Sequence, residues 1–135
     1  MKNLFLTIIL FSIILSCSEP LQDNWYELSS IPSKLKNTDN AIDIFNWVID
    51  NVDYVSYANN FHSAQKTLDE KKGNCANMAL LTLALNYEIR NNKGQLVYCK
   101  NGNDGLHYTV RINGKIIEPG IKEIYNIIDF DNIKL

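Results

Sequence analysis

The stretch of sequence that decides the fold runs from Lys71 to Arg90, KKGNCANMALLTLALNYEIR. Its residues from Ala76 to Leu85 are apolar almost without interruption, so a helix built from them is hydrophobic nearly all round. Such a helix belongs in the centre of a domain. We therefore expect a central buried helix that begins near Asn74 or Cys75 and ends at about Arg90.

Two shorter helices are expected before the central one. Thr38 or Asp39 can cap a helix that runs to about Asn51. Apolar residues at helical spacing predict one buried face for it, formed by Ile42, Phe45, Val48, Ile49 and Val52. Ser63 can cap the second helix, and Gly73 is a plausible stop for it.

The chain changes to strand patterns after the central helix. Residues 95–100 and 106–112 are typical of strands. Asn113-Gly114 is the strongest short hairpin signal, and residues 115–118 are its returning strand. Residues 121–135 carry a last strand or helix. Helices followed by antiparallel strands predict an α+β domain, in which the central helix packs on a small antiparallel sheet.

The N-terminus has the pattern of an export signal. Lys2 is followed by an apolar run from Leu4 to Leu15, which is short for a membrane span of about 20 residues. The cut site, Ile14-Leu15-Ser16-Cys17, resembles the lipobox of bacterial lipoproteins. That resemblance implies that Cys17 carries the lipid; the alternatives are an ordinary signal peptide or a short anchor helix.

This pattern divides the chain into a signal peptide (1–16), a lipidated cysteine with its tether (17–37) and one domain (38–135). Some apolar residues of the tether can dock on the domain: Trp25, Tyr26, Leu28 and Ile31. We expect an exported, membrane-anchored protein. Ser18 rather than Asp follows the cysteine, which by the sorting of known lipoproteins favours the outer membrane or cell surface over the inner membrane.

Charge and motif content argue against several classes of partner. The net charge is −2 and the chain has no basic run, so nucleic acid is not an expected partner. It has no glycine-rich phosphate loop, and its acidic residues are scattered, so we expect neither a cofactor nor a metal. The two histidines, His62 and His107, and the cysteine spacing do not suit a structural zinc site.

Two cysteines, Cys75 and Cys99, remain once Cys17 is assigned to lipid. In an exported protein they can form a disulfide. Alternatively, Cys75 is a free nucleophile, because a helix N-terminus stabilises an anion such as a thiolate. Cys99, in a predicted strand, then has a packing role.

His107 and Glu118 favour the second interpretation of Cys75. With a two-residue turn at Asn113-Gly114, the strand alternation places His107, Thr109 and Glu118 on one face of the hairpin. A histidine held by a carboxylate can activate and orient a cysteine nucleophile. His62 precedes Cys75 and is interpreted as a loop or capping residue.

Three segments together resemble the transglutaminase-like superfamily, whose domains share the papain-like cysteine-peptidase fold: FHSAQKTLDEKKGNC (61–75), the central helix, and GLHYTVRINGKIIEPG (105–120). The resemblance covers roughly residues 40–120. It implies that Cys75 is the nucleophile, His107 the general base and acid, and Glu118 the orienting carboxylate.

The resemblance implies a cysteine enzyme that acts on protein or peptide substrates. It would break peptide or glutamine amide bonds, by hydrolysis or by acyl transfer. The Cys75 backbone N–H is one expected oxyanion donor, and candidates for a second are Asn74, Gln65 and Trp47. The alternatives are a cell-wall peptidase of the NlpC/P60 type and a non-catalytic, lipid-anchored binding module of the same fold. A Cys75–Cys99 disulfide would favour the binding module.

Overall fold

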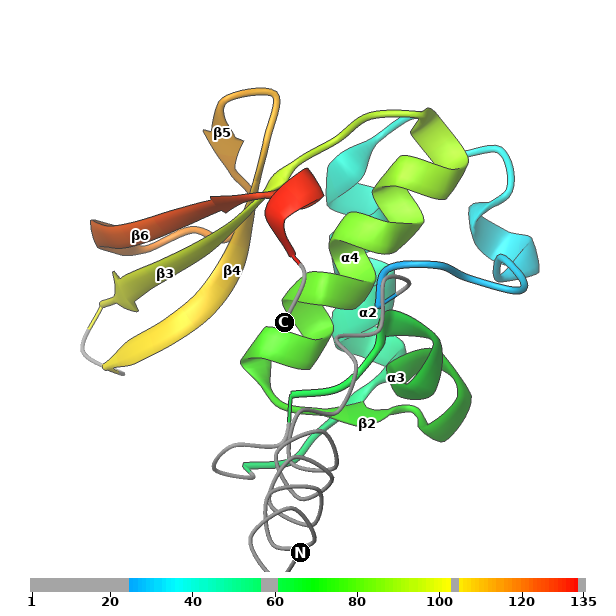
Figure 1. Cartoon of the computed structure of the whole chain (residues 1–135), viewed down its shortest axis with the longest axis horizontal. Coiled ribbons are helices and arrows are strands. Elements are labelled where there is room, and N and C mark those ends of the chain that lie inside the picture. The colour runs from blue at the N-terminus through cyan, green and yellow to red at the C-terminus, as the bar shows by residue number, and fades with distance from the viewer. Residues whose placement is uncertain (1–24, 57–60, 103–104, 134–135) are drawn as a thin grey trace, which may run out of the picture.

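The structure, a computed structural model, describes residues 25–56, 61–102 and 105–133. Within these ranges the helices come first and the antiparallel strands second, so the α+β expectation is confirmed (Figure 1). The predicted signal peptide (1–16) and the predicted lipidation site Cys17 lie outside the described residues. Of the helices that are described, none combines the length and the hydrophobicity needed to cross a bilayer.

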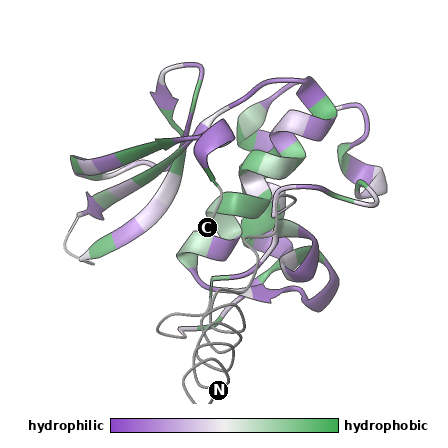
Figure 2. Ribbon diagram, viewed as in Figure 1, coloured by the Kyte–Doolittle hydropathy of each residue, from purple (hydrophilic) through white to green (hydrophobic). Residues whose placement is uncertain are grey.

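Helix α4 (Cys75–Arg90) is the central element, as its composition predicts. It lies between the sheet on one side and helices α2 (Ala41–Asn51) and α3 (Ala64–Glu70) on the other (Figure 1). Four of its leucines are completely buried: Leu80, Leu81, Leu83 and Leu85. Figure 2 shows that α4 is largely hydrophobic over its N-terminal and middle turns and more hydrophilic toward its C-terminal end. Burial of each such side chain contributes about 1.5–3 kcal/mol relative to exposure, so this helix supplies the centre of the core.

The cap of α2 differs from the expectation. Asn40, and neither Thr38 nor Asp39, precedes the first helical residue, and its side chain accepts a hydrogen bond from the Ile42 backbone N at 2.9 Å. The Thr38 hydroxyl instead donates to Asp43 Oδ2 at 3.1 Å. Asn40 has the extended backbone and short polar side chain that an N-cap requires, so the helix begins one residue later than Asp39 would allow.

The buried face of α2 is also rotated from the predicted one. Ile44 and Val48, one turn apart, are fully buried, whereas Ile42 and Ile49 are 51% and 49% exposed. The core contacts of α2 are made mainly with α4, and the short sequence pattern does not reveal which of two neighbouring stripes faces that helix.

Helix α3 begins at the predicted cap but ends early. The Ser63 side chain accepts from the Lys66 backbone N at 3.2 Å, which confirms the cap. Lys71, and not Gly73, terminates the helix, because Lys71 takes the left-handed conformation with φ of 51°. Gly73 already belongs to the next extended segment, where its carbonyl accepts from the Val55 backbone N at 3.0 Å.

Four antiparallel strands form the sheet in the order β5-β4-β3-β6. Their bounds are β3 (Gln95–Asn101), β4 (Leu106–Ile112), β5 (Lys115–Ile116) and β6 (Ile121–Asp129). The last segment is therefore a strand, followed by the 3-10 helix η2 (Phe130–Asn132). Strand β4 contacts α4, so the sheet packs on the central helix mainly through β4.

The β4–β5 hairpin has the predicted register. Arg111 pairs with Ile116 and Ile112 with Lys115, and both turn residues, Asn113 and Gly114, have positive φ (50° and 75°) as a two-residue turn of this type requires. The returning strand ends at Ile116 and not at residue 118. The next strand pairs with β3 and not with β5, so the chain must leave the edge of β4 to cross the sheet.

The segment before α2 packs on the domain. Apolar side chains of this segment lie against the core: Trp25, Tyr26, Leu28 and Ile31. The Trp25 carbonyl accepts from the Ala64 backbone N at 2.7 Å, and its ring stacks on Phe61 with centroids 5.3 Å apart. Pro32 is followed by the short 3-10 helix η1 (Ser33–Leu35), whose Leu35 is buried.

Candidate active site

Cys75 is the first residue of α4 and is half-buried. Asn74 precedes it as the N-cap, and a reciprocal pair of hydrogen bonds with Asn77 forms a capping box. The N-terminal end of a helix carries a partial positive charge, which favours an anion there. The sulfur of Cys75 therefore lies where a thiolate is electrostatically stabilised.

A short parallel ladder holds the chain just before Cys75. Strand β1 (Asp53–Tyr54) pairs with β2 (Lys72–Gly73), and the Asp53 backbone N donates to the Lys71 carbonyl at 2.8 Å. This ladder joins the chain that leaves α2 to the chain that enters α4. The cysteine is thus positioned by two segments about twenty residues apart in sequence as well as by its own helix.

His107 and Glu118 lie together, as the hairpin register predicts. His107 is the second residue of β4, and its Nε2 lies 3.0 Å from Glu118 Oε2. Both side chains are largely buried, with 21% and 22% of their surfaces exposed. The ring N–H is not aligned on the carboxylate as a hydrogen bond, so this is a close polar contact that is an ion pair only with a protonated imidazole. With Nε2 at the carboxylate, Nδ1 is the ring nitrogen left for a nucleophile.

Cys75, His107 and Glu118 line the same cavity, which has a volume of about 420 Å³. Much of the remaining wall is apolar and is formed by α2, by the residue that follows it and by the first turn of α4: Phe45, Ile49, Val52, Met78 and Ala79. The half-exposed Ile49, which the sequence pattern assigned to the core, therefore belongs to this cavity. A cavity with convergent ionisable groups and apolar walls is typical of a small binding or catalytic site.

Cys99 has the packing position that the sequence predicts. It is fully buried in β3 directly opposite His107, and its thiol contacts the His107 carbonyl at 3.5 Å. Burial raises the pKa of the Cys99 thiol, and the negative charges of Glu118 and ionised Cys75 raise it further. Cys75 and Cys99 are both free thiols, so the alternative of a disulfide between them is not realised in the structure.

Two of the candidate second oxyanion donors serve other roles. The side-chain oxygen of Gln65 accepts a hydrogen bond from the Ser29 backbone N at 2.7 Å. The side-chain nitrogen of Gln65 donates a hydrogen bond to Asp69 Oδ1 at 2.7 Å. Trp47 packs against the core, and neither residue lines the cavity. Asn74 is next to Cys75 but uses its side-chain oxygen for the cap.

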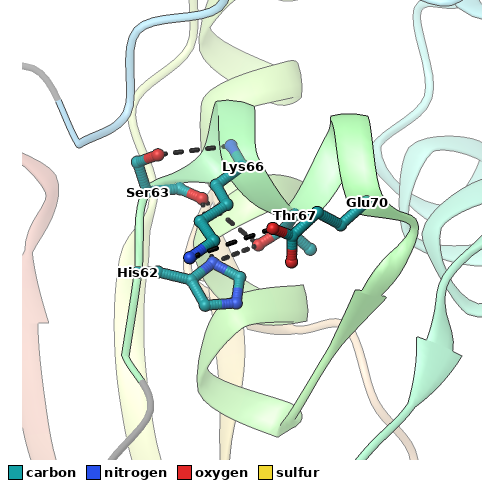
Figure 3. A network of polar contacts seen from close by, with 5 residues as sticks. All are labelled: His62, Ser63, Lys66, Thr67 and Glu70. Carbon is teal, nitrogen blue, oxygen red and sulfur yellow. Dashed lines mark hydrogen bonds and ion pairs between the residues drawn. The ribbon is translucent and has the colours of Figure 1, made fainter.

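His62 is a structural residue at the start of α3 (Figure 3). Its Nδ1 lies 3.2 Å from the Thr67 hydroxyl and 3.4 Å from the Ser63 carbonyl. The Thr67 hydroxyl also donates to the Ser63 carbonyl at 3.2 Å. His62 thus ties the chain before α3 to the helix, and it is not part of the cavity that holds Cys75.

The sequence reasoning missed one polar partner of the site. Asn101, at the end of β3, donates from Nδ2 to Glu118 Oε1 at 2.9 Å. Asn101 directly follows the strand expected at residues 95–100, and no local pattern pointed to a partner seventeen positions away.

Comparisons with known proteins agree with this architecture. The family model of the transglutaminase-like superfamily matches residues 29–86, which include the start of α4 with Cys75. A crystal structure of a protein from Cytophaga hutchinsonii, which carries the provisional name of a cysteine protease, has the same fold with a TM-score of 0.54 at 21% identity. The match covers 68% of this chain and 36% of that one, so the present chain spans only about a third of the solved structure. No curated protein matches the chain in sequence.

Residues 29–86 therefore match the transglutaminase-like superfamily, and the chain has the fold of the solved cysteine-protease-like neighbour. The fold expected from the residues around Cys75, His107 and Glu118 is confirmed.

Proposed function

We propose that the protein is a cysteine enzyme that cleaves peptide or glutamine amide bonds, with Cys75 as nucleophile, His107 as general base and acid, and Glu118 as the orienting carboxylate. The observation that carries the proposal is the 3.0 Å contact between His107 Nε2 and Glu118 Oε2 in the cavity that Cys75 also lines. A nucleophile, a base and a group that orients the base are the parts that covalent acyl transfer needs.

The chemistry follows from these positions. His107 Nδ1 takes the Cys75 thiol proton, and the sulfur attacks the amide carbonyl carbon to form a tetrahedral oxyanion. The C–N bond then breaks, His107 returns the proton to the leaving amine, and a thioester remains on Cys75. Water that attacks the thioester releases an acid and makes the protein a peptidase or amidase, whereas an amine forms a new amide and makes it a transglutaminase.

The first test is the pH dependence of Cys75 alkylation by iodoacetamide. Trypsin cuts after Lys72 and Lys93, so the two domain cysteines fall in different peptides, and mass spectrometry can follow each one in the same sample. We expect Cys75 to react rapidly well below pH 8, and to slow in a His107→Ala variant because the thiolate loses its imidazolium partner.

His62→Ala is the matched control, because it removes the other histidine from a place outside the cavity. Its alkylation profile should equal that of the parent protein. If Cys75 is equally unreactive in the parent and in His107→Ala, the catalytic proposal is wrong and the domain is better treated as a binding module.

Turnover is tested on peptide amides and on glutamine donors, each with and without a primary amine. Release of product with water alone indicates hydrolysis, whereas incorporation of the amine indicates acyl transfer. Cys75→Ala should abolish both. Release of peptide fragments from purified peptidoglycan would favour the NlpC/P60 alternative instead.

We also propose that the protein is exported and anchored to a membrane through lipid on Cys17, which favours substrates at the outer membrane or cell surface. The support is the sequence pattern of residues 1–17 alone. Partition into the detergent phase and an intact mass that includes the acyl chains would support it. A Cys17→Ala chain should lack the mass of the acyl chains, and a parent protein whose intact mass also lacks them would exclude the anchor.

A further inference from the structure

Both oxygens of the Glu118 carboxylate have a partner. Oε2 lies 3.0 Å from His107 Nε2, and Oε1 accepts a hydrogen bond from Asn101 Nδ2 at 2.9 Å. The reverse orientation of the Asn101 amide would bring its oxygen against a carboxylate oxygen, so the donor assignment is the favourable one. The carboxylate thus bridges the end of β3 and the start of β4.

The backbone on both sides of the Asn101 side chain is fixed by hydrogen bonds. The Asn101 N donates to the Gly105 carbonyl at 3.1 Å, and the Gly102 N donates to the Gly120 carbonyl at 3.0 Å. The second bond joins the end of β3 to the chain just after Glu118. A register shift between Lys100 and Asn101 in the pairing with β6 accompanies this arrangement, and such irregularities often re-aim a side chain next to a site.

Gly120 completes the arrangement. Its φ of 87° lies in the left-handed region, and a Cβ placed there would be 3.1 Å from Asn101 Oδ1. The close approach of the amide to the chain after Glu118 therefore depends on the absence of a side chain at position 120. Gly120 thus leaves room for the Asn101 amide, and the backbone hydrogen bonds fix the position from which the side chain extends.

We propose that Asn101 is a positioning residue for the candidate active site: it fixes the Glu118 carboxylate so that Oε2 stays on His107 Nε2. This inference rests on the proposed function. A glutamate side chain has three torsions, and a carboxylate held by one oxygen can swing about the last of them. A hydrogen bond to the second oxygen removes that freedom, so the imidazole keeps the orientation that leaves Nδ1 for Cys75.

The test compares Asn101→Asp and Asn101→Ala in the full chain. Asn101→Asp keeps the size of the side chain but places a second carboxylate against Glu118, whereas Asn101→Ala only removes the donor. The matched control is Asn126→Asp, which makes the same substitution at an exposed position of β6. The measurement is the pH profile of Cys75 alkylation, together with the thermal unfolding midpoint of each variant.

We expect Asn101→Asp to lower the Cys75 alkylation rate at neutral pH by about tenfold and Asn101→Ala to lower it by a smaller factor. Both variants lose the charge-assisted hydrogen bond to Glu118, and Asn101→Asp also adds repulsion between two carboxylates. The shape of the pH profile should change in both, which a general loss of stability would not cause. Asn126→Asp should leave the profile unchanged.

Two further variants separate failure of this inference from failure of the proposed function. If His107→Ala and Glu118→Gln slow Cys75 alkylation but both Asn101 variants match the parent, Asn101 has no positioning role and the proposed function stands. If His107→Ala has no effect either, the proposed function fails and the inference fails with it. A profile altered equally by Asn126→Asp would also overturn the inference.

Discussion

Asn74 and Asn77 hydrogen-bond each other in both directions across the first turn of α4. Asn74 Oδ1 accepts from the Asn77 backbone N at 3.0 Å, and Asn77 Oδ1 accepts from the Asn74 backbone N at 3.1 Å. Cys75 lies between these two residues, so the reciprocal pair determines where the helix begins and where the thiol projects. The candidate nucleophile is placed by a local device that is independent of the sheet.

Loss of this cap should destabilise the domain. Asn74→Ala removes the acceptor for the Asn77 N–H, and we expect the free energy of unfolding to fall by about 1 kcal/mol. Urea denaturation followed by circular dichroism measures the change. Asn126→Ala, on the exposed strand β6, is the control and should have little effect. Equal stability of the two variants would show that the capping box does not stabilise α4.

Gly73 is needed for the close packing of the chain that enters α4. A Cβ at this position would lie 2.8 Å from the Asn77 Cβ and 3.3 Å from Thr67 Cγ2. We expect Gly73→Ala to cost about 1–3 kcal/mol, because the overlap forces a backbone shift in a tightly packed region. The thermal midpoint should fall clearly more than in Lys72→Ala, whose side chain is exposed. A thermal midpoint of Gly73→Ala equal to that of Lys72→Ala would mean that α3 and α4 can move apart without loss of stability.

Cys99 should remain protonated under conditions in which Cys75 reacts. Burial raises the pKa of its thiol above the ordinary 9.0, with additions from Glu118 and Cys75. Because the folded-state pKa is the higher one, the stability due to the neutral thiol is fully present below about pH 9. It is lost as the pH rises above that value and through the folded-state pKa.

Unfolding measurements at pH 8 and pH 10 test this linkage. The parent protein should lose more stability between the two values than a Cys99→Ala variant, even though the variant is less stable at both because of the cavity it creates. The comparison of slopes cancels the contributions of other groups with raised pKa values, such as Lys93 and Tyr125. Parallel pH dependences would show that Cys99 does not titrate differently in the folded state.

The Thr109 hydroxyl should be dispensable for stability. It is buried, and it has no hydrogen-bond partner among the described residues. Thr109→Val keeps the shape and removes an unsatisfied polar group, so we expect a thermal midpoint equal to or above that of the parent. The reverse change at its cross-strand neighbour, Val97→Thr, should cost about 1–3 kcal/mol, since Val97 is fully buried. A clear loss of stability in Thr109→Val would reveal a bound water or another partner for the hydroxyl.

Sequence reasoning was most accurate where the signal is local. The apolar run after Cys75 predicted α4 over its full length, and Asn113-Gly114 predicted the hairpin register that brings His107 to Glu118. It was less accurate where one of several adequate residues had to be selected. Thr38, Asp39 and Asn40 can all cap a helix, and only the structure identifies Asn40 as the cap.

The sequence by itself determined the buried helix that begins at Cys75 and the hairpin that follows it, because both depend on residues near one another in the chain. Composition defines the first, and the backbone geometry of a two-residue turn defines the second. Only the tertiary structure decided that Asn101 holds the second oxygen of Glu118, and that Ile49 lines the cavity and does not belong to the core. These relationships form when the sheet and α2 pack on α4, and the pairing of segments distant in sequence depends on the whole core.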